Sequence, residues 1–387
     1  MARRSARAAA VALAVTGSCL LSSCSDDPAP GAADTVAPSP PSPSPSAPTS
    51  NAPATATTTR PSRGVPPAVG QVTTVASGLA VPWGLAFLPD GSALVAERDS
   101  GRILRLSGGS RQVVATPPGV AHGGEGGLLG LAVLARGAST QVFAYLTSVD
   151  GDNRVVTMDW DGQRLAPPRV VLKGIPSAGN HNGGRLAVGP DGMVYVATGD
   201  AGLRSASQDR GSLAGKILRM TPGGGIPSDN PFPGSLVWSW GHRNVQGLAF
   251  DSAGRLWATE FGQNTWDELN LIRRGGNYGW PLVEGDDDDP RYVRPQASWR
   301  TSEASPSGVA IVDDVAYVAA LRGRRVWQVP VAGGSAGRPV PLFVERYGRL
   351  RAAAVAPDGS LWLTTSNRDG RGRAAEGDDR ILRVALG

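Results

Sequence analysis

Cysteine is almost absent from this chain of 387 residues, in which Cys19 and Cys24 are the only two. Because none follows position 24, the rest of the chain has no internal disulfide, and a folded domain there must be held together by its apolar core. No run of Lys and Arg forms the basic footprint typical of nucleic-acid binding, so we expect no nucleic-acid partner. Histidine is also scarce, with only His122, His181 and His242.

The amino terminus lacks an apolar run long enough for a confident membrane span, yet it has the layout of an export signal. Arg3, Arg4 and Arg7 come first, followed by an apolar run and small residues before Cys24. The LSSC stretch resembles a lipobox, so we predict a lipoprotein-type signal peptide over residues 1–23, with Cys24 lipidated at the extracytoplasmic side of the cell membrane. A plain signal peptide with an incidental cysteine is the alternative, and both Sec and Tat export stay open.

Large apolar residues are nearly missing from the next segment, residues 24–66, in which proline, serine, threonine and alanine dominate. Such a segment cannot bury enough surface to offset its ordering entropy, so it is predicted to be a disordered tether. Without the three signal arginines the chain carries 35 basic and 33 acidic residues. The tether is expected to hold a folded domain, residues 67–387, away from the membrane surface.

One pattern recurs six times in that domain. Each copy has a short apolar strand, a turn that is often Pro-Asp-Gly, a second strand and, after a gap, a third; the copies begin at Trp83, Gly130, Gly184, Gly247, Ser307 and Ala352. Asp-Gly between apolar runs is a hairpin signal. Runs such as RQVVAT at 111–116 and RVVLKG at 169–174 complete four-stranded units. We therefore predict an all-β fold, a six-bladed β-propeller of four-stranded antiparallel blades. A pair of β-sandwiches would not explain the recurring pattern.

Several polar stretches border the inner strands, where a propeller has no structural need for them. They are NHNGG at 180–184, GHRN at 241–244 and RYGRLR at 346–351. Because inner strands converge on the central channel, we expect a basic pocket that combines one proton acceptor with several arginines, formed by His181, Arg243, Asn244, Arg322, Arg349 and Arg351. Such a pocket suits a ligand with several planar carboxylates. Ordinary salt bridges between blades are the alternative for each arginine.

From about residue 81 to 384 the chain resembles the soluble quinoprotein glucose dehydrogenases, and more closely the bacterial aldose sugar dehydrogenases of that group. The matching stretches are VPWGLAFLPDG, GEGGLLGLA, NHNGGRLAVGPDG with its following GD, WGHRNVQGLAF and DELNLIRRGGNYGWP. The last three, in this order and spacing, are specific. The resemblance implies a six-bladed propeller that uses pyrroloquinoline quinone (PQQ) and Ca²⁺.

The resemblance also implies roles for individual residues. His181 matches the general base and Asp200 its orienting partner. The cofactor contacts correspond to Glu125, Arg243, Asn244, Arg322, Arg349 and Arg351. The backbone carbonyls of Gly262 and Gln263 match those that hold the cofactor calcium, and Glu268 with the carbonyl of Tyr278 matches a second calcium site. Glu125 stands where the family often has glutamine, Gln263 replaces a proline, and Arg322 replaces a lysine.

These roles predict the activity. His181 is expected to remove the proton of a sugar's anomeric hydroxyl while hydride leaves C1 for the quinone, which gives a lactone and electrons for an external acceptor. We expect Arg322 to offset the charge of Glu125, and Glu125 to face the sugar. A calcium-dependent propeller lactonase and a non-catalytic binding propeller are the alternative functions. The sequence names neither the sugar nor the acceptor, because loops build the substrate rim.

Overall fold

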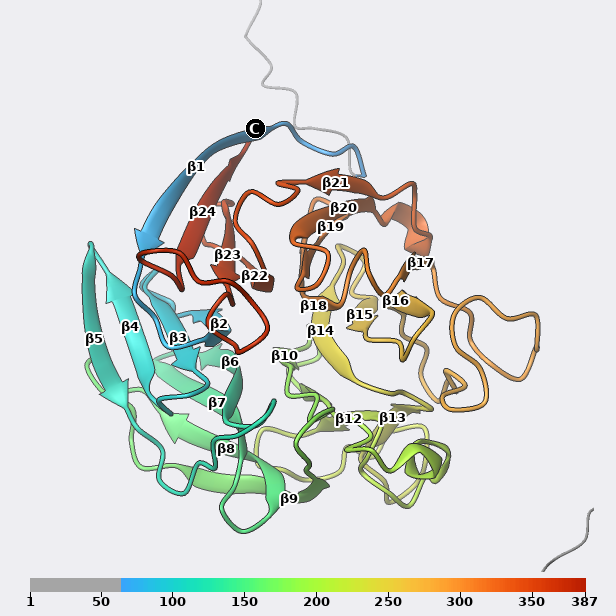
Figure 1. Ribbon diagram of the computed structural model, residues 1–387. Coiled ribbons are helices and arrows are strands. Elements are labelled where there is room, and N and C mark those ends of the chain that lie inside the picture. The colour runs from blue at the N-terminus through green and yellow to red at the C-terminus, as the bar shows by residue number, and fades with distance from the viewer. Residues whose placement is uncertain (1–63) are drawn as a thin grey trace, which may run out of the picture. The chain divides into compact units, whose positions relative to one another are not determined.

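Six four-stranded antiparallel sheets surround a central axis in the computed structural model, which describes residues 64–387 (Figure 1). This arrangement confirms the predicted six-bladed β-propeller. The predicted signal peptide, Cys24 and nearly all of the predicted tether lie outside the described residues.

The first three blades follow the chain order, each from its innermost to its outermost strand. Blade 1 contains β2 (Pro82–Phe87), β3 (Ala93–Glu97), β4 (Ile103–Ser107) and β5 (Ser110–Ala115). Blade 2 contains β6 (Leu128–Arg136), β7 (Ser139–Thr147), β8 (Asp152–Asp159) and β9 (Arg169–Pro176). Blade 3 contains β10 (Leu186–Val188), β11 (Val194–Ala197), β12 (Lys216–Met220) and β13 (Val237–Trp240).

The last three blades continue in the same way until the ring closes. Blade 4 contains β14 (Val245–Phe250), β15 (Leu256–Glu260), β16 (Trp266–Leu271) and β17 (Ala297–Arg300). Blade 5 contains β18 (Pro306–Val312), β19 (Val315–Ala320), β20 (Arg325–Pro330) and β21 (Val340–Leu342). Blade 6 contains β22 (Leu350–Val355), β23 (Leu361–Thr365), β24 (Ile381–Leu386) and, as its outermost strand, β1 (Val69–Ala76).

The two ends of the described chain meet in blade 6. Strand β1 pairs with β24 in antiparallel register, with Val69 opposite Leu386 and Thr73 opposite Arg383. The sixth blade is therefore built from both ends of the described chain, so its hydrogen bonds close the ring. The repeat pattern begins at Trp83 and gave no sign of this pairing.

The hairpin turns confirm the interpretation of the Pro-Asp-Gly motif. In the first of them, Asp90 Oδ1 accepts the backbone N–H of Ser92 at 2.9 Å, and Gly91 has φ 83°. Aspartate thus satisfies a turn amide, while glycine takes a left-handed conformation that other residues adopt only at a cost. Asp191 and Asp358 accept N–H groups in the same way.

The core consists of six apolar layers, one between each pair of neighbouring blades. Strand β7 shows how the alternation of side chains creates them. Val142 and Ala144 pack toward blade 1, whereas Phe143 and Tyr145 pack toward blade 3, and all four are fully buried. Both faces of such a strand are covered, which explains its nearly continuous apolar sequence.

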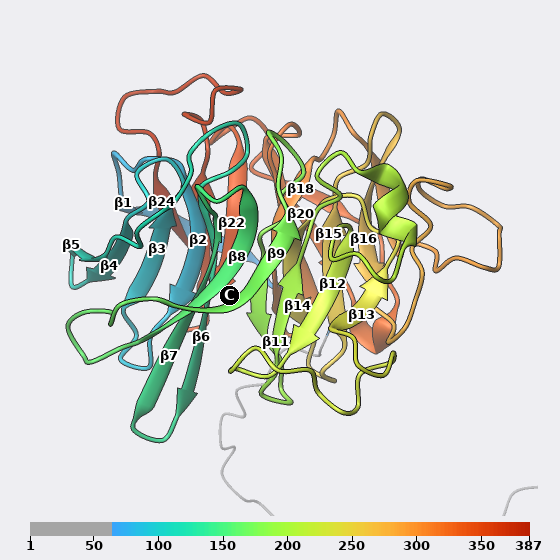
Figure 2. The same ribbon diagram turned by 90° about the horizontal axis from the view of Figure 1, so that it is seen from below.

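Regular helix is limited to two short 3-10 segments within residues 64–387, η1 (Arg204–Gln208) and η2 (Ala332–Gly334). None of the helices in this range is long and apolar enough to cross a membrane. Long loops gather at one end of the propeller, the upper end in the side view of Figure 2. Because the polar stretches of the sequence precede the inner strands, they lie at this end.

Candidate active site

The residues predicted to act as base and orienting partner lie in contact. His181 Nδ1 is 2.8 Å from Asp200 Oδ1, and Trp280 Nε1 donates to Asp200 Oδ2 at 2.8 Å. The Asp200 side chain is fully buried, whereas 15% of the His181 side chain is exposed. Burial opposes the charge of Asp200, but hydrogen bonds from His181, the Gly202 N–H and Trp280 hold the pKa of this carboxyl below its usual value. An ionised Asp200 favours the Nδ1–H tautomer and leaves Nε2 of His181 as a proton acceptor.

Glycine allows the loop that carries His181 to touch the end of β11. Gly199 pairs with Asn244 through an isolated β-bridge, and the Ala201 N–H donates to the His181 carbonyl at 3.1 Å. A Cβ atom at Gly199 would overlap that same carbonyl. His181 itself has φ 54°, an uncommon value for a residue other than glycine. The Gly-Asp pair at 199–200 therefore supplies both the close approach and the carboxylate that orients the imidazole.

Arg243 and Asn244 enter the same space from the loop before β14. Asn244 Oδ1 accepts the Gly183 N–H at 3.0 Å, which ties this loop to the histidine loop. Arg243 donates through one terminal nitrogen to the Phe261 carbonyl at 3.2 Å, and its guanidinium lies over the Trp280 ring at 5.3 Å. Arg243 Nε and Asn244 Nδ2 are buried without a hydrogen-bond partner in the described part of the chain. Buried unpaired donors are costly, so both atoms are available for a ligand.

Arg349 and Arg351 come from the opposite side of the ring, at the start of β22, and share a single carboxylate. Arg349 donates to Asp369 Oδ2 at 3.0 and 2.9 Å, and Arg351 reaches the same oxygen at 3.3 Å. Burial lowers the pKa of Arg351 only to about 10, so it stays charged at neutral pH. Two buried guanidinium groups beside one carboxylate leave a net positive charge. This excess fits the sequence-based expectation of an anionic ligand.

Glu125 has a different partner from the one expected. Its Oε1 accepts a hydrogen bond from Arg371 at 2.8 Å, and its Oε2 accepts the backbone N–H of His181 at 2.9 Å. The expectation that Arg322 offsets this charge is wrong: Arg322 is exposed and makes no ion pair within residues 64–387. The reason is topological, because the loop after β23 brings Arg371 over the mouth of the channel. Both oxygens of Glu125 thus hold protein groups, and its carboxylate supports the histidine loop.

The loop with the two predicted calcium-binding carbonyls is held by Glu284. Its Oε1 accepts the backbone N–H groups of four successive residues, at 2.8 Å from Gln263, 3.2 Å from Asn264, 3.0 Å from Thr265 and 3.1 Å from Trp266. In a trans peptide the C=O points opposite to the N–H. The carbonyls of Gly262 and Gln263, which share peptide units with the first two of these N–H groups, therefore point away from Glu284. Their orientation fits a role as ligands.

The second predicted calcium site coincides with a cavity beneath this loop. Its lining includes Glu260, Glu268, Tyr278 and Glu284. Burial, and next the negative charge of Glu260, raise the pKa of Glu268 to about 8. Carboxylates that repel one another in a cavity form a suitable environment for a hard cation. Within residues 64–387 no three His, Cys, Asp or Glu side chains cluster as a metal site, so backbone oxygens such as that of Tyr278 would have to complete the ligand set.

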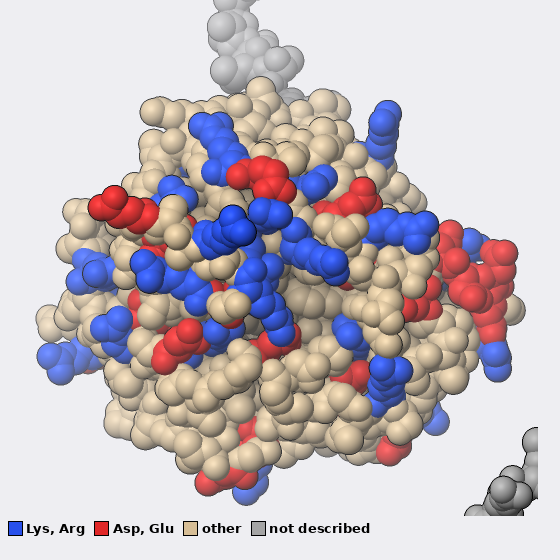
Figure 3. All heavy atoms as spheres, viewed as in Figure 1, with Lys and Arg blue, Asp and Glu red and all other residues tan. Residues whose placement is uncertain are grey.

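The structure thus brings together, around the channel mouth, His181, Asp200, Glu125, Arg243, Asn244, Arg349 and Arg351. Arg322 is exposed and, within the described chain, makes no hydrogen bond or ion pair with them. Figure 3 shows this face, where many basic side chains surround a central hollow. Sequence reasoning missed Trp280, Glu284, Asp369 and Arg371. Trp280 lies in the quoted NYGWP stretch and could have been found there. Arg371 and Asp369 belong to a loop without any recurring pattern.

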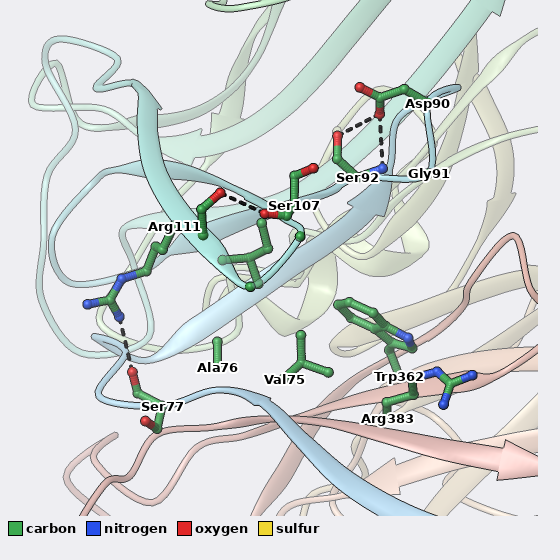
Figure 4. Close-up of a pocket in the computed structure, with 14 residues that line it drawn as sticks. Val75, Ala76, Ser77, Asp90, Gly91, Ser92, Ser107, Arg111, Trp362 and Arg383 are labelled. Atoms are coloured by element: carbon green, nitrogen blue, oxygen red, sulfur yellow. Dashed lines mark hydrogen bonds between the residues drawn. The ribbon is translucent and has the colours of Figure 1, made fainter.

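A separate groove, of about 600 Å³, lies at the outer edge between blades 6 and 1 (Figure 4). Its polar groups are occupied with one another: Ser92 donates to Asp90, and Arg111 donates to the carbonyl of Ser77 at 3.0 Å. Histidine is not among the residues that line it. The groove therefore lacks the acid–base pair found at the channel mouth.

Comparisons with known proteins identify the family of the described domain. Residues 79–382 match the family described as Glucose / Sorbosone dehydrogenase. The aldose sugar dehydrogenase YliI of Escherichia coli is 30% identical over 343 residues, which cover 79% of this chain and 92% of that protein. Quinoprotein glucose dehydrogenase B of Acinetobacter calcoaceticus is 35% identical over 258 residues, covering 57% of this chain and 54% of that protein.

A solved structure is also similar over the propeller. The PQQ-bound form of an aldose sugar dehydrogenase from Streptomyces coelicolor is 50% identical, with a TM-score of 0.80; the match covers 84% of this chain and 100% of that chain. The fold, the channel-mouth site and the match over residues 79–382 lead to one conclusion. The chain belongs to the glucose/sorbosone dehydrogenase family of sugar dehydrogenases.

Proposed function

We propose that the protein oxidises an aldose sugar at C1 to the lactone, with PQQ and Ca²⁺ as cofactors and an external molecule as final electron acceptor. The observation that carries this proposal is the His181–Asp200 hydrogen bond of 2.8 Å at the mouth of an arginine-rich channel. It pairs an oriented base with a binding site for an anion. The PQQ bound by the Streptomyces relative is a tricarboxylate of this kind.

The base has a defined proton to move. With Asp200 ionised, His181 Nε2 accepts the proton of the anomeric hydroxyl, and Asp200 stabilises the imidazolium that results. Trp280 keeps Asp200 in place through its second oxygen. The proton thus leaves the sugar to His181 Nε2, while the electron pair of the C1–H bond leaves as hydride.

The cofactor would be held by groups that have spare hydrogen-bonding capacity. Arg243 Nε and Asn244 Nδ2 are buried donors without partners in the described chain, and Arg349 and Arg351 share one carboxylate. When bound, PQQ supplies the hydride acceptor and Ca²⁺ the Lewis acid that makes it electrophilic. The carbonyls of Gly262 and Gln263 would hold that calcium. Glu268 and the carbonyl of Tyr278 would hold a second ion, which stabilises the fold.

A reconstitution assay tests the proposal. Apo-protein with both PQQ and Ca²⁺ should reduce an artificial dye when one or more aldoses of a panel are added. Omission of either cofactor should abolish the dye reduction. Sugar binding without dye reduction would favour a non-catalytic binding propeller. Lactone hydrolysis that needs Ca²⁺ but not PQQ would favour a lactonase. Either result would overturn the dehydrogenase proposal.

We also propose that the protein works outside the cytoplasm as a lipoprotein anchored through Cys24. The support is the signal-like layout of residues 1–23, the LSSC stretch and the composition of residues 24–66. A tether of about 40 residues after a lipid anchor would let the propeller reach sugars and acceptors near the membrane surface.

A further inference from the structure

A second cavity occupies the opposite end of the propeller axis. It measures about 400 Å³ and is lined by the far ends of the innermost strands β2, β6, β10, β14, β18 and β22. The site residues described above precede these strands, so this cavity opens on the other face. Its walls are alanine, leucine, valine, isoleucine and phenylalanine, and its one charged lining residue is Arg185.

Arg185 is held in one orientation but is left largely without partners. The residue is 6% exposed, Nε donates to the Gln246 carbonyl at 2.8 Å, and the guanidinium lies 4.3 Å from the centroid of the Trp83 ring. Neither terminal nitrogen makes a hydrogen bond to the described protein, and one of the two is fully buried. Stacking on Trp83 fixes the plane of the group, and its N–H edge remains free.

No carboxylate within residues 64–387 compensates this charge. Arg351 is near instead: its guanidinium carbon lies 5.9 Å from the same Trp83 ring. Burial, and then repulsion by Arg351, lower the pKa of Arg185 to about 9, so it remains a cation at neutral pH. Buried charges in proteins are normally paired, since an isolated one costs several kcal/mol or shifts its pKa until it is neutral. Within the described protein, Arg185 is neither paired with a carboxylate nor neutral at pH 7.

We propose that the axial cavity is a binding site for a small monovalent anion such as chloride, held by the free N–H edge of Arg185. Apolar walls of low dielectric around the positive charge of Arg185 focus its electric field toward the opening of the axial cavity. This field attracts an anion. A small anion suits the site better than a tricarboxylate, because the walls offer no second donor. The cavity opens on the face opposite the channel mouth, although the Arg185 guanidinium shares the Trp83 ring with Arg351 of the channel-mouth site. The proposal does not depend on the dehydrogenase activity.

The link to the channel-mouth site runs through Gln246. Its backbone carbonyl accepts from Arg185, and its side-chain Oε1 accepts from Arg351 at 3.3 Å and from Ser307 at 3.0 Å. An anion at Arg185 would reduce the repulsion between the two guanidinium groups. Chloride should therefore stabilise the folded protein even before any sugar or PQQ is added.

Location is tested by soaking crystals of the PQQ-free protein in bromide and collecting anomalous diffraction data. We expect a bromide peak within hydrogen-bonding distance of the terminal nitrogens of Arg185, and no such peak in Arg185→Met. A water molecule at this position, with no anomalous signal, would overturn the proposal. A bromide peak at the Arg349–Arg351 pair would be a different site and would not support the proposed site at Arg185.

Chloride binding in solution is tested by comparing Tm in a chloride salt with Tm in a gluconate salt at equal ionic strength. Wild type should show a saturable rise in Tm of about 1 to 3 °C in chloride, as expected for a ligand of the native state. Arg185→Met, which removes the buried charge and keeps an unbranched side chain, should show no difference between the two salts. Arg322→Gln serves as the control that keeps the response. An equal chloride response in Arg185→Met, or none in wild type, would rule out the site.

Discussion

Glu125 and Arg371, which are 246 positions apart in the chain, are joined by a hydrogen bond of 2.8 Å across the mouth of the channel. Glu125 is 15% exposed and Arg371 61% exposed in their side chains. Although burial opposes the charge of Glu125, Arg371 and the His181 N–H hold the pKa of Glu125 below its usual value. The acid therefore carries a negative charge beside a site that is proposed to bind a tricarboxylate.

This pair predicts that the proposed PQQ binding is sensitive to Arg371. We expect Arg371→Ala to weaken PQQ binding by roughly three- to tenfold in wild type, a modest value because solvent screens the exposed guanidinium. The loss should be smaller in a Glu125→Gln background, where no charge needs to be offset. A double-mutant cycle with PQQ titration measures the coupling. Arg322→Ala is the matched control and should show none. Coupling to Arg322 in place of Arg371 would contradict the observed pairing.

The His181–Asp200 pair predicts a loss of turnover without a loss of fold. His181→Ala should reduce sugar oxidation by about 10²- to 10⁴-fold, the usual contribution of a positioned general base, while PQQ still binds. Asp200→Asn should also lower kcat, since an amide no longer fixes the tautomer. His122→Ala is the control, because the one hydrogen bond of that imidazole within residues 64–387 is to the Arg98 carbonyl, at 3.0 Å. Turnover near the wild-type value in His181→Ala would remove this residue from the mechanism.

Calcium removal should affect both activity and stability. A chelator is expected to abolish PQQ-dependent dye reduction and to lower Tm, and added Ca²⁺ should restore both, because a ligand of the native state stabilises it. Glu268→Gln should reduce the Tm gain from Ca²⁺, whereas exposed Glu376→Gln should leave it unchanged. If chelation altered neither activity nor Tm, the assignments at Gly262, Gln263, Glu268 and Tyr278 would fail together.

Lys216 predicts an unusual pH dependence of stability. Its ammonium is fully buried and donates to the carbonyls of Ala206, Ser207 and Ala214 at 2.8, 3.1 and 2.6 Å. Burial lowers its pKa from 10.5 to about 8, with a smaller opposing effect of Asp209. Between pH 8 and 10.5 Lys216 binds more protons in the unfolded chain than in the folded protein. The free energy of unfolding should therefore rise with pH, by about 1.4 kcal/mol per pH unit.

Comparison with Lys216→Met isolates this effect. The stability of wild type minus that of the variant, measured by denaturant unfolding, should be constant below pH 8 and grow between pH 8 and about 10.5. If the stability of wild type relative to Lys216→Met fell between pH 8 and about 10.5, the predicted direction of the pH dependence would be wrong. Lys173→Met, on the outer strand β9, is the control.

The proposed lipid anchor is tested by fractionation. Wild type should partition with membranes after export, whereas Cys24→Ser and a form that begins near Val65 should be released. Cleavage of the signal must be checked by mass spectrometry, because an uncleaved signal also retains protein. A correctly cleaved Cys24→Ser protein that stays in the membrane fraction would argue against lipidation.

The sequence by itself determined the blades, because the signals involved are local. Apolar alternation, Pro-Asp-Gly turns and six recurrences define hairpins within a few residues, and strands such as β5 and β9 follow the predicted runs. The same holds for the candidate base, since His181 stands in a glycine-rich loop where a propeller needs no histidine. Local patterns of this kind depend on neighbours in the chain and not on the rest of the fold.

Only the tertiary structure decided which distant residues meet. The pairing of β1 with β24, the choice of Arg371 over Arg322 for Glu125, the contact of Trp280 with Asp200, and the unpaired Arg185 on the axis all depend on how the blades close into a ring. Thirty-eight basic residues look alike in a sequence. Burial and the distance to a counter-charge distinguish them, and both are set by contacts between segments far apart in the chain.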